Sequence, residues 1–282
     1  MSTYKQLLQT GRELLKQQGI ADADVDAWYL LAHVCGINRT DLLLRGDIPV
    51  EQPLEDRYLE LVRQRERHIP LQHITGVQEF MGLEFEVNGN VLVPRQDTEV
   101  LAEEVLKVCK DRSILDMCTG SGCIIISLAK LGSPKLAVGA DLSEEALAVA
   151  ARNVKRHGAE VKLVQSNLFE KIAESPGLPV TYDILVSNPP YIPSGEIREL
   201  MPEVRDHEPG MALDGGGDGL LFYRRISEAA KRHLNREGYL FYEIGYDQGE
   251  AVRQILQREG FADIEIKKDL SGLDRVVSAR RW

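Results

Sequence analysis

Apolar residues in roughly the first seventy positions recur at the spacing of amphipathic helices. Glycine and proline interrupt this pattern at Gly19, at 36–38 and at 46–49. The recurring apolar residues are Leu7, Leu8, Leu14 and Leu15, followed by Trp28, Leu30, Leu31 and Val34. We therefore expect a small helical bundle over residues 1–76.

Alternating apolar and polar positions replace the helical spacing from Gln78 to Pro94. Such alternation indicates strands with one buried face. Asn88-Gly89-Asn90 separates two alternating stretches, and Asn-Gly in this position is a strong hairpin signal. We expect residues 77–94 to form a β-hairpin that links the bundle to the rest of the chain.

Strand-like and helix-like patterns alternate from about Arg95 onward, which indicates a doubly wound α/β sheet over residues 95–282. The last two strands are joined only by residues 268–274, which is too short for a helical crossover. We therefore expect the last strand to be antiparallel to its neighbour. The expected strands lie near 113–118, 136–141, 161–165, 182–188, 238–243, 262–267 and 275–280.

Polar residues stand where four of these strands end: Asp116, Asp141, Asn167 and Asn188. In an open α/β sheet, the ligand crevice lies at the carboxyl ends of the strands, near the switch in strand order. We therefore expect these four side chains to meet at one site.

The stretch 113–126 predicts a strand, a glycine-containing loop and then a helix. Gly120 and Gly122 permit positive φ and a close approach of the backbone to a ligand. The helix that follows presents free N–H groups at its start. This pattern is typical of a nucleotide-type cradle, although a glycine loop alone is weak evidence.

Asp141 lies about twenty residues beyond the loop, the spacing at which a βαβ unit places a carboxylate against a ribose diol. Serving only in the N-cap region of the next helix is the alternative role for Asp141. The loop lacks the Gly-Lys-Ser/Thr of a Walker A site and the Gly-x-Gly-x-x-Gly of a dinucleotide site. Asp116 would repel a pyrophosphate but suits a cationic amino-acid group, which favours S-adenosylmethionine.

Asn188-Pro189-Pro190-Tyr191 follows the fourth expected strand. Its two prolines remove two backbone donors and leave carbonyls that can only accept hydrogen bonds. With the Asn188 side-chain oxygen and the Tyr191 ring, these carbonyls could hold a planar NH2 group ready for attack. A plain turn is the alternative, because Asn and Pro commonly follow strands.

Together these motifs resemble the class I S-adenosylmethionine-dependent methyltransferases that act on planar amino or amide nitrogens. Nearly the whole chain is similar to one family, the peptide-chain release factor glutamine N5-methyltransferases. The resemblance implies a Rossmann-like sheet, an N-terminal bundle that recognises the substrate, and methylation of the glutamine in the Gly-Gly-Gln motif of class 1 release factors. The segments that carry it are 71–76, 79–85, 91–99, 212–220 and 243–249.

The resemblance also implies which residues form the site, and it implies no bound metal. Phe80 and Arg95 would line the substrate entrance, although packing and surface charge are equally open roles for these residue types. Glu243 ends a strand and stays outside the set. The catalytic and substrate-binding motif is Asn188, Pro189, Pro190 and Tyr191. The cofactor-binding residues are Asp116, Cys118, Thr119, Gly120, Ser121, Gly122, Asp141, Leu142, Asn167, Leu168 and Asn188.

Two positions depart from the family pattern. Cys118 stands at the first glycine of the family's Gly-x-Gly-x-Gly, which puts a side chain where the backbone usually meets the cofactor. Asn167-Leu168 replaces a frequent Asp-Trp pair. Asn167 can still hydrogen-bond an exocyclic amine, whereas Leu168 offers adenine no aromatic face.

Net charge and cysteine content narrow the class of protein. The formal net charge of −10 gives no basic excess for nonspecific duplex binding, which disfavours a nucleic-acid substrate. The four cysteines show no pairing framework and the N-terminus has no apolar signal core, which indicates a cytoplasmic protein with reduced thiols. We expect a monomer that has release factors as its partners and no membrane association.

Two further segments and two rival functions stay open at this point. Residues 192–218, rich in proline and glycine, predict either a substrate lid or a plain surface loop. We interpret the basic run Arg63, Arg65, Arg67 and His68 as a solvated helix face. One rival function is a nucleic-acid amino methyltransferase acting on adenine N6 or guanine N2. The other is a noncatalytic S-adenosylmethionine-binding partner of the translation machinery.

Overall fold

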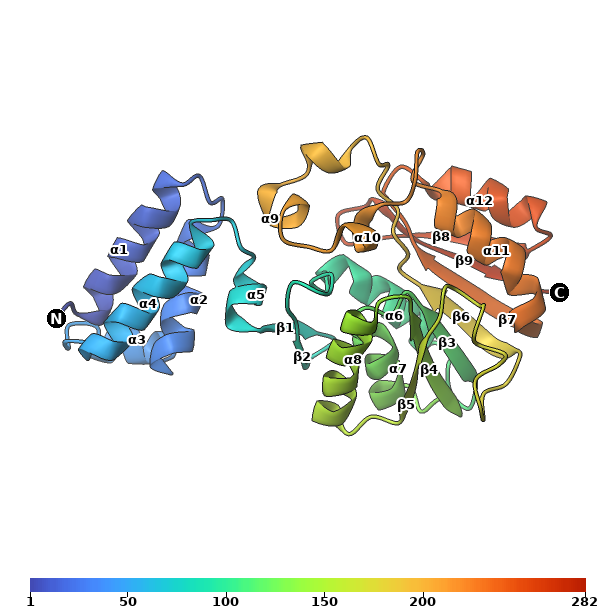
Figure 1. Cartoon of the computed structure of the whole chain (residues 1–282), viewed down its shortest axis with the longest axis horizontal. Coiled ribbons are helices and arrows are strands. Elements are labelled where there is room, and N and C mark those ends of the chain that lie inside the picture. Colours follow the sequence, from blue (N-terminus) through green and yellow to red (C-terminus); the bar gives the residue numbers. More distant parts are fainter. The chain divides into compact units, whose positions relative to one another are not determined.

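The computed structural model describes residues 1–282, which form two compact units (Figure 1). The helical unit comprises Met1–Gly76 together with Met201–His207. The sheet unit comprises Val77–Leu200 and Glu208–Trp282. A short piece from the second half of the chain therefore belongs to the unit that the N-terminal residues build.

The helical unit confirms the predicted bundle. Its first helix begins at a capping box, in which Thr3 Oγ1 accepts a hydrogen bond from the Gln6 N–H at 3.3 Å. Its core encloses Tyr58, whose hydroxyl donates to Ala27 O at 3.3 Å. None of the helices in the chain has both the length and the apolar run needed to cross a bilayer. The helices of this unit are α1 (Tyr4–Gln17), α2 (Ala23–Cys35), α3 (Arg39–Arg45), α4 (Gln52–Arg65), α5 (Leu71–Thr75) and α9 (Pro202–Arg205).

The sheet unit contains one seven-stranded sheet with the strand order β5-β4-β3-β6-β7-β9-β8. The first five strands in this order are parallel, whereas β9 is antiparallel to both β7 and β8. The predicted α/β sheet and its antiparallel last strand are therefore confirmed. The strands are β3 (Ser113–Met117), β4 (Leu136–Asp141), β5 (Val161–Gln165), β6 (Tyr182–Ser187), β7 (Leu234–Glu243), β8 (Ala262–Lys268) and β9 (Asp274–Arg280).

Helices bury both faces of this sheet. Successive strand residues point to opposite faces, so Ile114 and Leu115 belong to different cores. The core of Ile114 includes residues of α6 (Glu99–Leu106) and α7 (Cys123–Leu131), and α8 (Glu144–His157) packs beside α7. The core of Leu115 includes residues of α11 (Leu221–His233) and α12 (Gly249–Arg258). Burial on both faces explains the nearly continuous apolar runs of the central strands.

The carboxyl ends of the central strands lie side by side. Met117 on β3 is in register with Ala140 on β4 and with Ser187 on β6. The loops after these three strands therefore leave the sheet at one edge. The strand order also switches here, because the chain continues from β3 to β4 on one side and returns to β6 on the other. This is where open α/β sheets form their ligand crevice.

The turn of the hairpin differs from the prediction. Strand β1 (Val77–Phe80) pairs with β2 (Leu83–Glu86), and Met81-Gly82 forms the turn between them. These two residues have φ of +53° and +71°, as a two-residue type I′ turn requires. The predicted turn at Asn88-Gly89-Asn90 is wrong, because Val91 packs with residues of α8 instead of pairing in a strand. Asn88 Oδ1 there accepts the Asn90 N–H at 2.9 Å, in an Asx turn.

The proline- and glycine-rich segment 192–218 is closed at its base by backbone hydrogen bonds. Ile192 N–H donates to Leu213 O at 3.0 Å, and Gly215 N–H donates to Ile192 O at 2.8 Å. Between these bonds lie η2 (Ile197–Glu199), α9 and α10 (Gly210–Leu213). The segment is thus a closed loop with short helices of its own.

Candidate active site

The loop between β3 and α7 places three residues in the left-handed backbone region. The φ angles are +63° at Cys118, +55° at Gly120 and +79° at Gly122. A Cβ at Gly122 would lie 2.9 Å from Ile126 Cδ1, so glycine allows the loop to pack against its own helix. The space around Gly120 is open, which leaves room for a ligand close to the backbone. The loop therefore has the shape of a ligand cradle.

Asp116 lies beneath this loop and is fully buried. Its Oδ2 accepts a hydrogen bond from Thr119 Oγ1 at 2.6 Å, whereas its Oδ1 has no partner. Burial raises the pKa of Asp116 to about 7 against the effect of the Thr119 hydrogen bond, and the charge of Asp141 adds to the rise. A buried carboxylate with a free oxygen gains free energy from a cationic neighbour. The orphaned oxygen therefore fits a cofactor that carries positive charge.

Asp141 ends β4, with each carboxylate oxygen held by a backbone N–H. Oδ2 accepts from Gly120 at 2.8 Å, and Oδ1 accepts from Ser143 at 3.0 Å. Ser143, not Asp141, is the N-cap of α8, since its Oγ accepts from Ala146 N–H at 3.0 Å. Each Asp141 oxygen keeps a second lone pair, which is what a ribose diol needs in an acceptor.

One pocket of the sheet unit collects most of the residues predicted to bind the cofactor. Asp116 and Gly122 do not line it but support the loop that does. Arg95 and Pro190 also line this pocket, whereas Pro189 and Tyr191 do not. The predicted cofactor residues in the lining are Cys118, Thr119, Gly120, Ser121, Asp141, Leu142, Asn167, Leu168 and Asn188.

The same lining contains residues to which the sequence pattern assigned no role. Several come from segments 91–99 and 212–220, whose similarity to the family was the signal that could have found them. Others follow β5, occupy the start of α11 or lie in the closed loop. The additional residues include Leu92, Pro94, Thr98, Ser166, Pro209, Met211, Ala212 and Phe222.

Asn188 directs its amide nitrogen toward Thr98, in the short helix η1 (Gln96–Thr98). Asn188 Nδ2 donates to Thr98 Oγ1 at 3.5 Å, which leaves the side-chain oxygen as an acceptor. Glu243, at the end of β7, is 2% exposed, and its Oε2 has no partner. Burial raises the pKa of Glu243 to about 7, whereas hydrogen bonding from Thr98, the charge of Arg275 and hydrogen bonding from Asn188 oppose the rise. Thr98 and Glu243 thus bear on the orientation of Asn188, although neither was predicted as a site residue.

Two glycines and a glutamine enclose the backbone of Tyr191. A Cβ at Gly215 would lie 2.7 Å from Tyr191 Cα, and one at Gly219 would collide with Tyr191 O. Gln248 Nε2 donates to Tyr191 O at 2.9 Å. The segments 212–220 and 243–249 therefore support the Asn-Pro-Pro-Tyr turn, a role that their sequence pattern did not reveal.

Arg95 is fixed at the pocket by a buried carboxylate. Its Nη2 donates to both oxygens of Glu208, at 2.8 and 2.7 Å. Glu208 Oε1 also accepts the Val93 N–H at 3.2 Å. Burial raises the pKa of Glu208, although the charge of Arg95 opposes the rise. The Arg95 side chain is therefore fixed at the pocket by its ion pair with Glu208 and is not a free surface charge.

Phe80 requires a correction, because its ring lies in the core and not at a substrate entrance. It is 1% exposed and packs edge-on against Phe85, with the ring centroids 6.2 Å apart. Both rings belong to the core that α6 and α7 cover. The alternate spacing of the hairpin turns this side chain inward, so the packing role is the one that the structure supports.

The two departures from the family pattern share a backbone feature. Cys118 and Leu168 both have positive φ, +63° and +51°, and both line the pocket. Left-handed backbone is costly for a residue with a Cβ, so these positions carry local strain. Phe222 of α11 lines the same pocket and supplies an aromatic ring that Leu168 lacks. Arg225 of α11 holds Asn167, with Nη2 3.3 Å from Asn167 Oδ1.

A seven-stranded sheet of this order, with an antiparallel last strand, is the fold of the class I S-adenosylmethionine-dependent methyltransferases, and this protein is one of them. A solved methyltransferase from Pyrococcus furiosus has the same fold, with a TM-score of 0.54 and 16% identity over 72% of this chain and 90% of that chain. At this identity the likeness concerns the fold alone.

Sequence relatives identify the family. Residues 6–76 match the PrmC N-terminal domain, and residues 95–204 match the methyltransferase small domain. The release factor glutamine methyltransferase of Geobacter sulfurreducens is 42% identical over 99% of this chain and 96% of its own length. That of Agrobacterium fabrum is 38% identical over 99% of this chain and 98% of its own length. The chain belongs to the release factor glutamine methyltransferase family.

Proposed function

We propose that this enzyme methylates the N5 amide nitrogen of the glutamine in the Gly-Gly-Gln motif of class 1 peptide-chain release factors. The observation that carries the proposal is the position of Asn188. Asn188 lines the same pocket as the loops that follow Asp116 and Asp141. Its amide nitrogen already donates a hydrogen bond to Thr98. Its side-chain oxygen is therefore left to accept a hydrogen bond from an incoming NH2 group. Family membership names the class of protein that carries this group.

The cofactor residues divide by chemistry. S-adenosylmethionine, when bound, supplies an electrophilic methyl group on a positively charged sulfur. Asp116 would face the cationic amino-acid end of the cofactor, and Asp141 would accept hydrogen bonds from the ribose hydroxyls. Asn167 would accept a hydrogen bond from the exocyclic amine of adenine. Leu168 and Phe222 would pack against the base.

The acceptor residues would position the amide rather than activate it with a strong base. An amide nitrogen is a poor nucleophile, because its lone pair is delocalised into the carbonyl. The Asn188 side-chain oxygen and the Pro189 carbonyl would accept the two amide protons and align the nitrogen for in-line attack. Tyr191 lies outside the pocket lining and would anchor this turn through its backbone oxygen, which accepts from Gln248 Nε2. Proton loss can follow methyl transfer, so the site needs no general base of high pKa.

The helical unit is the proposed recognition module for the release factor. Its family match over residues 6–76 lies outside the catalytic sheet unit and supports a separate task. The net charge of −10 gives no support for a nucleic-acid substrate. Release factors act with the ribosome, so we propose a cytoplasmic site of action.

The test is to locate the transferred methyl group. The protein is incubated with isotopically labelled S-adenosylmethionine and either a class 1 release factor or a nucleic-acid mixture. Peptide mass spectrometry should place the label on the Gly-Gly-Gln glutamine. A release factor with that glutamine replaced by alanine is the matched control and should stay unlabelled. Label on adenine or guanine, or cofactor binding without transfer, would overturn the proposal.

A further inference from the structure

A seven-residue segment of the closed loop belongs to the helical unit. We call this segment, Met201–His207, the strap. Its chain neighbours on both sides, Leu200 and Glu208, belong to the sheet unit. The strap is separated by more than a hundred residues of sequence from the helices that it contacts, so neither its helix α9 nor its sequence pattern predicts this partner.

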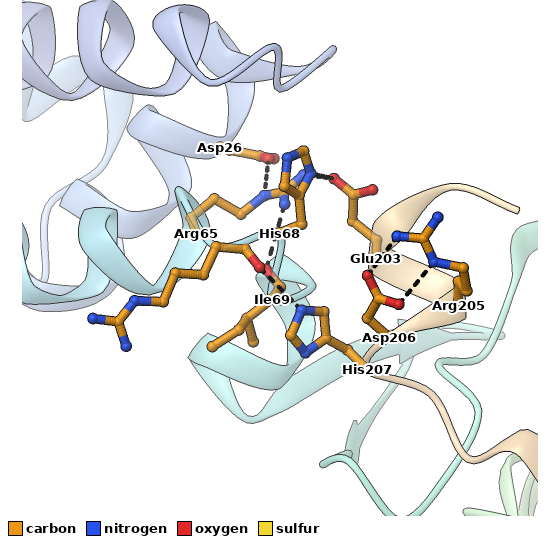
Figure 2. Close-up of polar contacts among 9 residues, drawn as sticks. Asp26, Arg65, His68, Ile69, Glu203, Arg205, Asp206 and His207 are labelled. Atoms are coloured by element: carbon orange, nitrogen blue, oxygen red, sulfur yellow. Dashed lines mark hydrogen bonds and ion pairs between the residues drawn. The ribbon is translucent and has the colours of Figure 1, made fainter. Parts of the chain in front are cut away.

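Arg65 of α4 is the centre of the contacts that hold the strap (Figure 2). Its Nε lies 2.7 Å from Asp26 Oδ2, and its Nη2 lies 2.9 Å from Glu203 Oε1 on the strap. His68 Nδ1 lies 3.1 Å from the same Glu203 oxygen. The guanidinium thus joins a buried carboxylate of α2 to a carboxylate of the strap.

This arrangement corrects the interpretation of the basic run as a solvated helix face. Arg65 is only 6% exposed, whereas Arg63 and Arg67 are exposed. The physical reason is the acid pair, because Asp26 and Glu203 compensate a charge that would otherwise be too costly to bury. The acid from the strap lies too far away in sequence for a local charge pattern to reveal it.

Polar contacts, not apolar packing, fasten the strap. None of its seven residues is buried. A second contact of the strap with the helical unit comes from His207, whose Nε2 lies 3.0 Å from the backbone oxygen of Arg67, just after α4. A segment without buried apolar groups opens at low cost unless specific contacts hold it. The Arg65–Glu203 pair is the most buried of these contacts.

The chain on either side of the strap leads directly to the active site. Upstream, the backbone of Tyr191 is held by Gln248. Downstream, Glu208 holds Arg95, and Met211 lines the pocket. Met201, at the start of the strap, is 67% exposed, and an exposed methionine gives an adaptable apolar contact to a protein partner. The strap is thus the middle one of three fixed points along the loop.

We propose that Arg65 is a positioning residue for the protein substrate. By holding Glu203 it fixes the strap on the helical unit, and it thereby positions the exposed Met201 for contact with the protein substrate. The partner chemistry is an apolar stretch of that substrate protein. This inference rests on the proposed function and adds to it a residue that does not line the pocket.

The test compares Glu203→Ala and Arg65→Met with Arg63→Met, the matched control on the exposed face of the same helix. Glu203→Ala leaves the Arg65–Asp26 pair intact, so it is expected to fold even if Arg65→Met, which leaves Asp26 buried without a partner, does not. Both test variants should raise the KM for the release factor about tenfold, with kcat within about twofold and unchanged cofactor affinity, as expected for lost ground-state positioning. Arg63→Met should behave like the parent protein.

Two further readouts decide the outcome. The double variant Arg65→Met/Glu203→Ala should raise the KM no more than the worse single variant does, because both changes break the same Arg65–Glu203 contact to the strap. Amide hydrogen exchange over 201–207 should be faster in Glu203→Ala than in Arg63→Met. Equal exchange rates, equal KM values or additive losses would each overturn the inference. Exchange is measured without turnover, so it tests the role of Arg65 even where the release factor proves not to be the substrate.

Discussion

The two halves of the pocket are built in different ways. The cofactor half rests on short-range features, in which a strand end, a glycine loop and the next strand end place Asp116, Gly120 and Asp141 together. The acceptor half rests on long-range side-chain contacts. Asn188 Nδ2 donates to Thr98 Oγ1, about ninety residues earlier in the chain. The backbone oxygen of Tyr191 accepts from Gln248, which is the N-cap residue of α12. The loop proposed to meet the amino-acid and ribose parts of the methyl donor is therefore a local property of this chain, whereas acceptor positioning depends on the completed fold.

The largest effect should come from Asn188→Ala, in the acceptor half. Removing the oxygen that accepts an amide proton should lower kcat by about 10²-fold, as expected for a lost transition-state hydrogen bond. The loops of the cofactor half should be left intact, so the melting temperature should change little and cofactor affinity should fall far less than kcat. Single-turnover methylation of the release factor measures the effect. Near-normal turnover would separate Asn188 from the chemistry.

The next effect belongs to Asp116→Asn, in the cofactor half. The neutral amide should weaken cofactor affinity by about tenfold, because it cannot compensate a positive charge. Folding stability should not fall, because a buried carboxylate with an orphaned oxygen costs free energy. Titration calorimetry and thermal unfolding test the two parts. Unchanged affinity would mean that Asp116 serves the loop alone.

The pKa of Asp116, raised to about 7, makes the same half pH-dependent. A cationic cofactor favours the ionised carboxylate, which is the minor form below pH 7 and the major form above it. Affinity should therefore rise about tenfold from pH 6 to pH 8, following the ionised fraction. In Asp116→Asn the affinity should vary much less over this range. An equal slope in both proteins would assign the titration to another group.

A smaller effect is expected from Glu243→Gln, which acts through Thr98 and Asn188. The change should lower kcat about fivefold, by analogy with positioning contacts, while KM stays within about twofold. Glu265→Gln, at an exposed position of the edge strand β8, is the control and should leave both constants unchanged. A raised KM with an unchanged kcat would contradict a role of Glu243 in orienting Asn188.

The smallest effect concerns strain in the cofactor loop. Cys118→Gly should raise the free energy of unfolding by up to about 1 kcal/mol, because glycine adopts the left-handed region without a Cβ penalty. Ser133→Gly, at an exposed residue with φ of +51°, is the matched control outside the pocket. Both should stabilise in urea unfolding, and Cys118→Gly alone should alter cofactor affinity. Destabilisation by Cys118→Gly would mean that the thiol packs favourably enough to offset the strain.

The contrast between the halves also explains what the sequence could predict. The strands and the glycine loop follow from apolar runs and from backbone needs, both of which are local. The hairpin turn was misplaced because Met81-Gly82 carries a weaker signal than Asn88-Gly89, and only packing decided between them. Glu243, Gln248 and Glu208 find their partners only in the folded chain, so no spacing rule reveals them. Arg65 was misread for the same reason.

A structure of the protein with S-adenosylmethionine and a Gly-Gly-Gln peptide would show whether Asn188 holds the acceptor amide beside the methyl group. We expect the acceptor amide nitrogen to lie about 2.7–3.2 Å from the Asn188 side-chain oxygen, the range of a hydrogen bond, on the side that faces the methyl group. A methyl group that points away from Asn188, with no space between them for a carboxamide, would contradict it.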